Sequence, residues 1–186
     1  MTLRFEGFHG TSFESAASII RQGYKSSIGD REWLGDGVYF FTEGLSKTPI
    51  HQAEEWAKAQ SWDKERHTYK YTKLSVLKSH IAVDEERLLD LTTADGVEII
   101  DYIIAKHVEK MSSIGKRMTY IDGYVINFAR LEGILPIDVA KGNFYIKFER
   151  ERIKQIDRRT ANCTICAVYE PAKNIKNTEL LLTKEF

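Results

Sequence analysis

A histidine stands directly before Gly-Thr-Ser in the stretch FHGTSFESAASIIRQG, residues 8–23. The pattern predicts a strand that ends near His9 and a helix that follows it. At such a junction a glycine has no Cβ, so a ligand can approach the backbone of Gly10, whose N–H and C=O can bind a planar carboxamide. The His9 ring can donate a hydrogen bond to a ribose hydroxyl. Thr11 and Ser12 lie at the helix start, where free N–H groups favour polar or anionic ligands.

A second stretch whose residue types could bind a ligand is WLGDGVYFF at residues 33–41. It predicts a glycine-rich turn at Gly35 and Gly37 that runs into an apolar strand carrying Tyr39. A tyrosine ring beside a cleft can stack on a flat heterocycle. Taken one at a time, both positions have ordinary alternatives, a capping or core histidine for His9 and a half-buried strand aromatic for Tyr39.

Two helices are predicted to position these stretches. Thr11 and Glu14 form a T-x-x-E capping box, and Gly23 fits just past the end of the first helix. Pro49 suits the first position of a second helix. That helix would place four residues on one face, namely Ala53, Trp56, Ala57 and Gln60.

The remaining pattern predicts further strands and a long helix. The helix covers residues 93–111, where apolar residues recur at helical spacing. The strands are HTYKYTKLSVL (67–77), YVINFA (124–129), FYIKF (144–148) and TICAVY (164–169). Strands and helices do not alternate as in a doubly wound fold, so we expect a mixed α+β fold in a single domain over residues 1–186.

Composition limits the classes of partner and compartment. The 186 residues include 27 Lys and Arg and 27 Asp and Glu, so bulk charge does not favour nucleic acid or an anionic membrane. A basic run over residues 147–159 is interrupted by acidic residues and predicts a solvated face. No apolar run has the length of a signal peptide or a membrane span, so we expect a cytoplasmic protein without a membrane partner.

The two cysteines do not indicate a metal site. Cys163 and Cys166 are spaced as C-x-x-C, but a second pair is missing and the stretch reads as a strand. Residues three apart on a strand face opposite ways. We therefore expect both to be small core residues in a reducing compartment.

Together, FHGTS (8–12) and GDGVYF (35–40) resemble the first two signature elements of the ADP-ribosyltransferases of the diphtheria-toxin and poly(ADP-ribose) polymerase type. TICAVYEPAKNI (164–175) resembles the final strand of that family. WLGDGVYFF followed by AEEWA (53–57) resembles short bacterial members, several of which serve as toxins in toxin–antitoxin and phage-defence systems. The resemblance covers residues 8–57 and 160–175 and implies an ADP-ribosyltransferase-like domain, with a split mixed or antiparallel sheet flanked by helices.

The resemblance implies NAD as the co-substrate and assigns roles to the first two stretches. His9 would hold the adenosine ribose, and Gly10 would hold the nicotinamide carboxamide through its backbone, with Thr11 beside them. Tyr39 would stack on the nicotinamide ring. Trp56 would supply a second aromatic wall, with a core helix aromatic as an equally good interpretation.

The third signature position departs from the pattern of the polymer-building members, which carry a glutamate there. The alignment places Ile165 at that position with Thr164 beside it, and a slip of one residue would exchange the faces of the strand. The resulting triad of His9, Tyr39 and Ile165 resembles members that attach a single ADP-ribose. A carboxylate could instead come from elsewhere in the chain, and the alternatives are Glu43, Glu132 and Glu170.

A Glu-x-Glu pair in FERER, residues 148–152, resembles the arginine-directed cholera-toxin type. That class uses an arginine where this chain has His9, so we interpret Glu149 and Glu151 as surface charge.

The resemblance therefore implies an intracellular NAD-dependent mono-ADP-ribosyltransferase, a bacterial toxin or phage-defence effector. It would transfer one ADP-ribose to a protein or nucleic-acid acceptor and release nicotinamide, and an antitoxin protein would be a further partner. Two alternatives remain. An NAD-dependent RNA 2′-phosphotransferase has a similar fold but needs arginines and histidines around a phosphate. A non-catalytic module that binds NAD or ADP-ribose would not need the missing glutamate.

Overall fold

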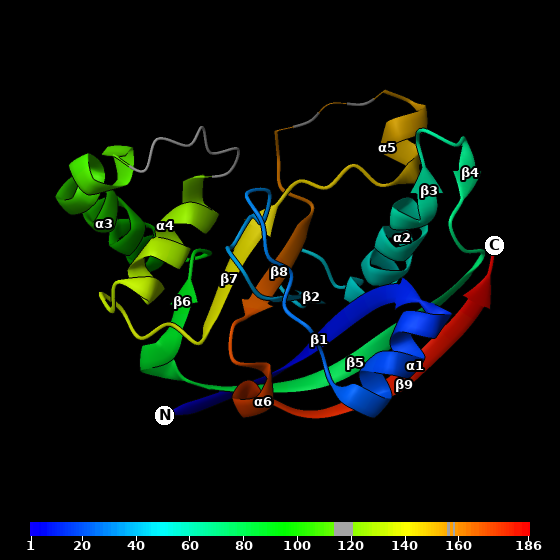
Figure 1. The fold of residues 1–186 in the computed structure, drawn as a ribbon, viewed down its shortest axis with the longest axis horizontal. Coiled ribbons are helices and arrows are strands. Elements are labelled where there is room, and N and C mark those ends of the chain that lie inside the picture. The colour runs from blue at the N-terminus through cyan, green and yellow to red at the C-terminus, as the bar shows by residue number, and fades with distance from the viewer. Residues whose placement is uncertain (114–120, 156, 158) are drawn as a thin grey trace.

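A seven-stranded sheet carries the fold of the part of the chain that the computed structural model describes, residues 1–113, 121–155, 157 and 159–186 (Figure 1). Its strand order is β6-β7-β8-β2-β1-β5-β9. Neighbouring strands are antiparallel except for the parallel pair β6 and β7. The strands are β1 (Thr2–Ser12), β2 (Val38–Thr42), β5 (Lys73–Asp84), β6 (Leu88–Asp90), β7 (Val139–Phe144), β8 (Cys163–Val168) and β9 (Ile175–Glu185).

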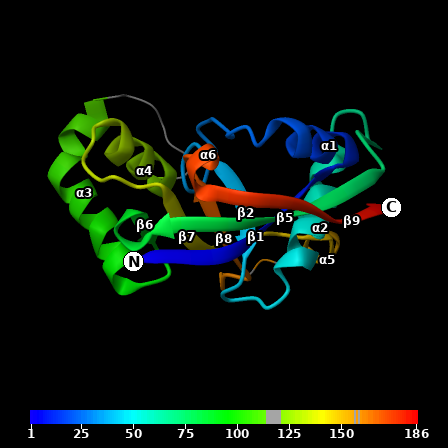
Figure 2. The same cartoon turned by 90° about the horizontal axis from the view of Figure 1, so that it is seen from below.

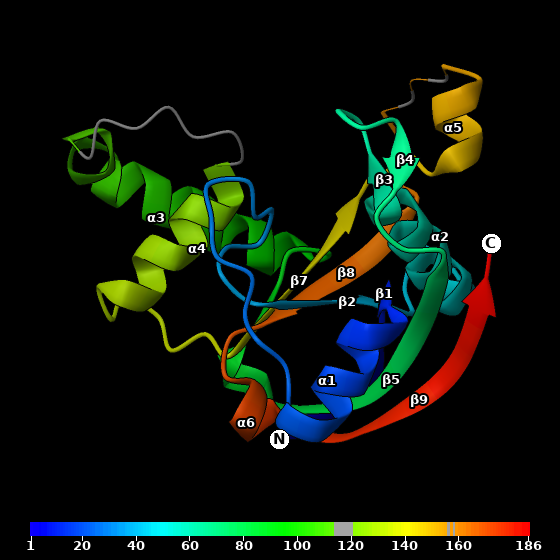
Figure 3. The same cartoon turned by 45° about the vertical axis from the view of Figure 1, so that its right-hand side comes forward.

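The sheet divides between β1 and β2. These two strands are paired at one position, Phe8 opposite Phe41, whereas β1 pairs with β5 and β2 pairs with β8 along their whole lengths. Figure 3 shows the two parts, β1-β5-β9 and β2-β8-β7-β6, running in different directions. The edge of β1 beyond Phe8 therefore has no strand neighbour on the β2 side.

Helices flank this sheet, so the mixed α+β architecture predicted from the sequence is confirmed. Figure 2 shows α1 and α2 on opposite sides of the β1-β5-β9 part, and α3 and α4 pack together beside β6 and β7. The helices are α1 (Phe13–Gln22), α2 (Pro49–Ser61), the 3-10 turn η1 (Glu85–Arg87), α3 (Ala94–Ser113), α4 (Ile121–Leu131), α5 (Glu149–Ile153) and α6 (Pro171–Asn174). A separate two-stranded ribbon joins β3 (Trp62–Asp63) to β4 (Thr68–Tyr69).

The cap of the first helix differs from the prediction by one residue. Ser12 is the N-cap, and its Oγ accepts a hydrogen bond from the N–H of Ser15 at 3.1 Å. The T-x-x-E box is therefore wrong, and Thr11 is the second-last residue of β1. The end of the helix is as predicted: Gly23 has a φ of +82° and donates its N–H to the carbonyl of Ile19. The helices predicted at Pro49 and over 93–111 are also confirmed, as α2 and α3.

The strand predicted at YVINFA (124–129) is wrong, because these residues lie in α4. Their branched and aromatic side chains suit a strand, but the buried positions recur at helical spacing, at Val125, Ile126, Phe128 and Ala129. These side chains pack in the same core as Ile100 and Ile103 of α3. Burial against a neighbouring helix thus outweighs the local preference for a strand.

Two other strand predictions are only partly right. The strand predicted over 144–148 lies earlier in the chain. The observed strand β7 covers Val139–Phe144, so it ends at the residue where the predicted strand begins. The predicted strand 67–77 is divided between β4 and the start of β5, which continues to Asp84. The strand predicted over 164–169 is confirmed as β8.

Apolar clusters cover the two faces of the sheet, and the cysteines belong to different ones. Cys163 packs with Ile165 in one cluster, and Cys166 packs with Phe40 in the other. Both thiols are free and buried, and burial raises their pKa to about 12. The interpretation of both as core residues is confirmed.

The predicted surface charge of residues 147–159 is supported in part. Glu149 pairs with Lys58 at 2.9 Å, and Lys147 pairs with Asp157. Arg158 lies outside the described residues. Among the helices of the described segments, none combines the length and apolar character needed to cross a membrane.

Candidate functional site

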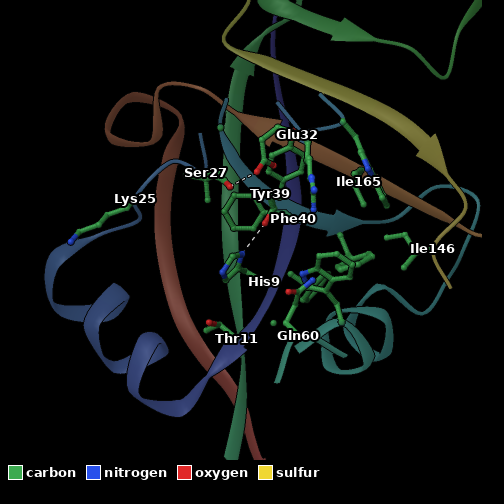
Figure 4. A pocket seen from close by; sticks show the side chains of 18 of the residues that line it. His9, Thr11, Lys25, Ser27, Glu32, Tyr39, Phe40, Gln60, Ile146 and Ile165 are labelled. Atoms are coloured by element: carbon green, nitrogen blue, oxygen red, sulfur yellow. Dashed lines mark hydrogen bonds between the residues drawn. The ribbon is translucent and has the colours of Figure 1, made fainter. Parts of the chain in front are cut away.

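A cleft of about 880 Å³ opens where β1 and β2 part (Figure 4). This volume lies in the range of small-molecule sites, roughly 300–1,000 Å³. Every site residue predicted from the sequence lines it: His9, Gly10, Thr11, Tyr39, Trp56 and Ile165. The structure thus brings together side chains from β1, β2, α2 and β8, which are distant in the chain.

His9 is held by a hydrogen bond to the backbone of Tyr39. Its Nδ1 lies 2.8 Å from the Tyr39 carbonyl oxygen, and because a carbonyl only accepts, Nδ1 carries the hydrogen. The ring packs edge-on against Tyr24 and Phe40, at centroid distances of 5.4 and 5.8 Å. Burial lowers the pKa of His9 below 6.5, and the hydrogen bond to Tyr39 opposes this shift only in part. The neutral ring therefore presents Nε2 as an acceptor rather than the donor that the sequence indicated.

Tyr39 ties the loop before β2 to the sheet. Its hydroxyl donates to the carbonyl of Gly35 at 2.7 Å and accepts from the N–H of Leu34 at 2.9 Å. Burial raises the pKa of the phenol, and the charges of Glu32 and Asp36 raise it further. The phenol stays protonated, so Tyr39 offers the cleft a fixed ring and not a base.

Ile165 is the residue of β8 that faces the cleft. It lies opposite Phe41 of β2, and its side chain is buried in the cluster that also contains Phe41. Thr164 is bonded elsewhere, since its hydroxyl donates to Asn143 and accepts from the N–H of Leu45. The register therefore selects Ile165 and not Thr164 for the cleft. The neighbouring positions of β8 on the same face are also apolar, namely Cys163 and Ala167.

Gly10 is a glycine because α2 crosses β1 at this point. A Cβ on Gly10 would lie 1.7 Å from the carbonyl oxygen of Ala53. Ala53 is one helical turn before Trp56, so this close approach also sets the height of Trp56 above the cleft. The Trp56 ring lies edge-on to Trp33 with centroids 6.5 Å apart. The lack of a side chain at position 10 therefore allows α2 to pack closely on β1, and the backbone of Gly10 also lines the cleft.

The structure adds a carboxylate to the cleft that sequence reasoning missed. Glu32 lines the cleft, and its Oε1 accepts a hydrogen bond from the Ser27 hydroxyl at 2.6 Å. Trp33 lines the cleft as well, stacked on Phe144 at 5.2 Å. Both residues lie in the loop before β2, where no periodicity marks them. Trp33 is the first residue of WLGDGVYFF, and Glu32 directly precedes that stretch.

The three glutamates proposed from the sequence do not line the cleft. Glu43 is exposed after β2, and Glu132 pairs with Lys110 of α3. Glu170 lies at the start of α6, 3.9 Å from Arg130. The described residues therefore leave Glu32 as the carboxylate of the site.

The cleft offers aromatic walls, a neutral histidine acceptor and one carboxylate, with Lys25 and Arg31 as its cationic lining. Such a set suits a ligand that carries a flat ring, hydroxyls and negative charge.

Comparison with known proteins adds no activity to this description. No protein-family model matches the chain. An uncharacterised protein of Methanocaldococcus jannaschii is 28% identical over 180 aligned positions, which cover 87% of this chain and 78% of the relative.

Proposed function

We propose that the chain is an NAD-dependent mono-ADP-ribosyltransferase. The observation that carries the proposal is the meeting of three distant residues at one cleft, namely His9, Tyr39 and Ile165. These are the positions at which the sequence resembles the three signature elements of that family. The cleft volume, its aromatic walls and its neutral histidine all fit a dinucleotide with a planar ring at one end.

In this proposal each residue has one task. His9 accepts a hydrogen bond from an adenosine ribose hydroxyl through Nε2. Tyr39 and Trp56 hold the nicotinamide ring, and Gly10 binds its carboxamide through the backbone. NAD supplies a positively charged nicotinamide, which is already a leaving group, so the protein mainly has to orient the ribose and exclude water.

Transfer of one ADP-ribose follows from the apolar face of β8. Ile165, with Cys163 and Ala167 beside it, cannot orient a ribose hydroxyl or take a proton from a second incoming ribose. Elongation would need a carboxylate at this strand, so we infer single transfer.

The proposed setting is the cytoplasm of a bacterial cell, where the chain acts as a toxin or phage-defence effector with an antitoxin partner. Its support is the resemblance of WLGDGVYFF (33–41) followed by AEEWA (53–57) to short bacterial members. The proposed acceptor is a protein or a nucleic acid.

A non-catalytic module that binds NAD or ADP-ribose is the second candidate. It is favoured by one observation, the absence of a carboxylate from the cleft-facing positions of β8.

The test is incubation of the purified protein with labelled NAD and a cell lysate. We expect label on a macromolecule, and digestion with protease or nuclease assigns the acceptor to one class. Binding of NAD without nicotinamide release or label transfer would favour the module. NAD-dependent removal of the internal 2′-phosphate from RNA, with the phosphate transferred to ADP-ribose and nicotinamide released, would favour the phosphotransferase.

A further inference from the structure

Glu32 is held through one of its two carboxylate oxygens. Its Oε1 accepts the Ser27 hydroxyl at 2.6 Å, and Oε2 has no hydrogen-bond partner among the described residues. Figure 4 shows Glu32 beside the ring of Tyr39, with the bond to Ser27 fixing the direction of its carboxylate. The side chain is half-buried at the cleft rather than extended into solvent.

The loop that carries Glu32 is anchored to the sheet. Tyr39 bonds to both Leu34 and Gly35, and the Tyr169 hydroxyl donates to the Leu34 carbonyl at 2.5 Å. The base of the loop is closed by paired backbone bonds between Ser27 and Gly37. The loop that carries this carboxylate is therefore anchored by hydrogen bonds at its base and directly after Glu32.

Helix α4 supports the same loop from the other side. A Cβ on Gly123 would lie 2.0 Å from the carbonyl oxygen of Glu32, so the two backbones are in direct contact. One turn later, Asn127 accepts the N–H of Asp36 at 2.9 Å. Figure 3 shows the loop between α1 and β2 lying along α4.

From this geometry we propose that Glu32 is the catalytic carboxylate of the cleft. The inference rests on the proposed function. Glu32 would orient a hydroxyl of the nicotinamide-side ribose and accept the proton of the acceptor nucleophile. As the acceptor lone pair bonds to the ribose carbon, the bond from that carbon to nicotinamide breaks, and nicotinamide leaves with the bonding electrons. The proton on Glu32 then passes to water.

This assignment explains how the apolar face of β8 is compatible with catalysis. A carboxylate supplied from the loop takes the role for single transfer, while Ile165 keeps the last strand without a base for elongation. The restriction to one ADP-ribose would thus depend on whether the carboxylate lies on the loop before β2 or on strand β8.

The test compares Glu32→Gln with Glu43→Gln in the full chain. The glutamine amide oxygen can still accept from Ser27, so the loop should stay in place. We expect kcat for NAD turnover to fall about 100-fold or more, the range of a lost general base. KM for NAD should change less than about threefold. Glu43 lies outside the cleft, so Glu43→Gln should match the wild type.

Ser27→Ala is the second variant, because it removes the bond that aims Glu32 without removing the carboxylate. We expect a smaller loss, about 10-fold in kcat. Wild-type turnover together with Glu32→Gln activity within about threefold of it would overturn the role of Glu32 and leave the proposed function standing. Wild-type protein that binds NAD but does not turn it over would overturn the proposed function and, with it, this inference.

Discussion

The Nδ1 atom of His9 lies 2.8 Å from the carbonyl oxygen of Tyr39, so the segments FHGTS and GDGVYF are joined by a hydrogen bond between a side chain and a backbone. This bond spans the division between β1 and β2, where strand pairing is reduced to Phe8 opposite Phe41. It fixes the histidine tautomer and aims Nε2 away from Tyr39. The same contact therefore links the two parts of the sheet and orients the His9 ring in the cleft.

The tautomer of His9 predicts a pH dependence of NAD binding. Burial lowers the pKa of His9 below 6.5, so the ring is neutral at pH 7 and Nε2 can accept. Below that pKa, protonation converts Nε2 to a donor and removes the acceptor. Calorimetric titration should show affinity that is constant from about pH 8 to 6.5 and falls at lower pH. His9→Ala should bind more weakly with no such dependence, and affinity that rises on acidification would contradict the assignment.

The two tasks of Tyr39 can be separated by substitution. Tyr39→Phe keeps the ring but removes the bonds to Leu34 and Gly35, each worth about 0.5–1.5 kcal/mol of unfolding free energy. We expect lower stability in urea and a partial loss of NAD turnover. Tyr39→Ala removes the ring as well and should abolish turnover. Equal activity of the two variants would show that the ring itself does not bind nicotinamide.

Gly10→Ala tests the packing of α2 on β1. The added Cβ would meet the Ala53 carbonyl at 1.7 Å, a backbone contact that cannot be relieved by a rotamer change. Overpacking typically costs about 1–3 kcal/mol. We expect at least this loss in chemical unfolding, with reduced NAD binding as Trp56 is displaced. Thr11→Ala, at the next cleft position, should unfold close to the wild type. A stable Gly10→Ala variant that only fails to bind NAD would assign the glycine to the ligand alone.

The pKa of Asp138 predicts how the stability of the fold decreases at acid pH. Its buried carboxylate accepts two bonds from Arg87, at 2.6 and 2.7 Å, and one from Lys173 at 2.6 Å. The hydrogen bonds from Arg87, followed by that from Lys173, lower its pKa to about 2 against the opposing effect of burial. The folded pKa is thus below the unfolded value of about 3.9. The stability from this carboxylate is complete above that value and is lost as pH falls toward 2.

Asp138→Asn should remove this part of the acid dependence. We expect a fall in Tm of roughly 3–12 °C at pH 7, from about 1.5–3 kcal/mol for a hydrogen bond to a charged group. The difference from the wild type should shrink between pH 4 and 2. A difference that is constant with pH would show that the carboxylate charge does not stabilise the fold.

Part of the site could be predicted from the sequence because local chemistry marks it. The junction at His9, the proline that begins α2 and the apolar pattern of β8 each depend on nearby residues. The alignment predicts Ile165 at the third position but allows a slip of one residue, and pairing of β8 with β2 fixes the register at Ile165.

Other parts depend on tertiary contacts that leave no local trace. The sequence of α4 is compatible with either a strand or a helix, and packing beside α3 determines that it forms a helix. Glu32 has no periodic signal, and its place in the cleft depends on Ser27 and on contact with Gly123 of the same α4. The error at α4 and the omission of Glu32 thus share one cause.

We propose that a single ADP-ribose is transferred from NAD at this cleft. The most direct test of this transfer is mass spectrometry of the labelled acceptor, with nicotinamide release measured in the same reaction for wild type and His9→Ala. We expect one ADP-ribose increment per site, one nicotinamide released for each, and neither with folded His9→Ala. A ladder of increments would contradict single transfer, and equal nicotinamide release by folded His9→Ala would contradict the site.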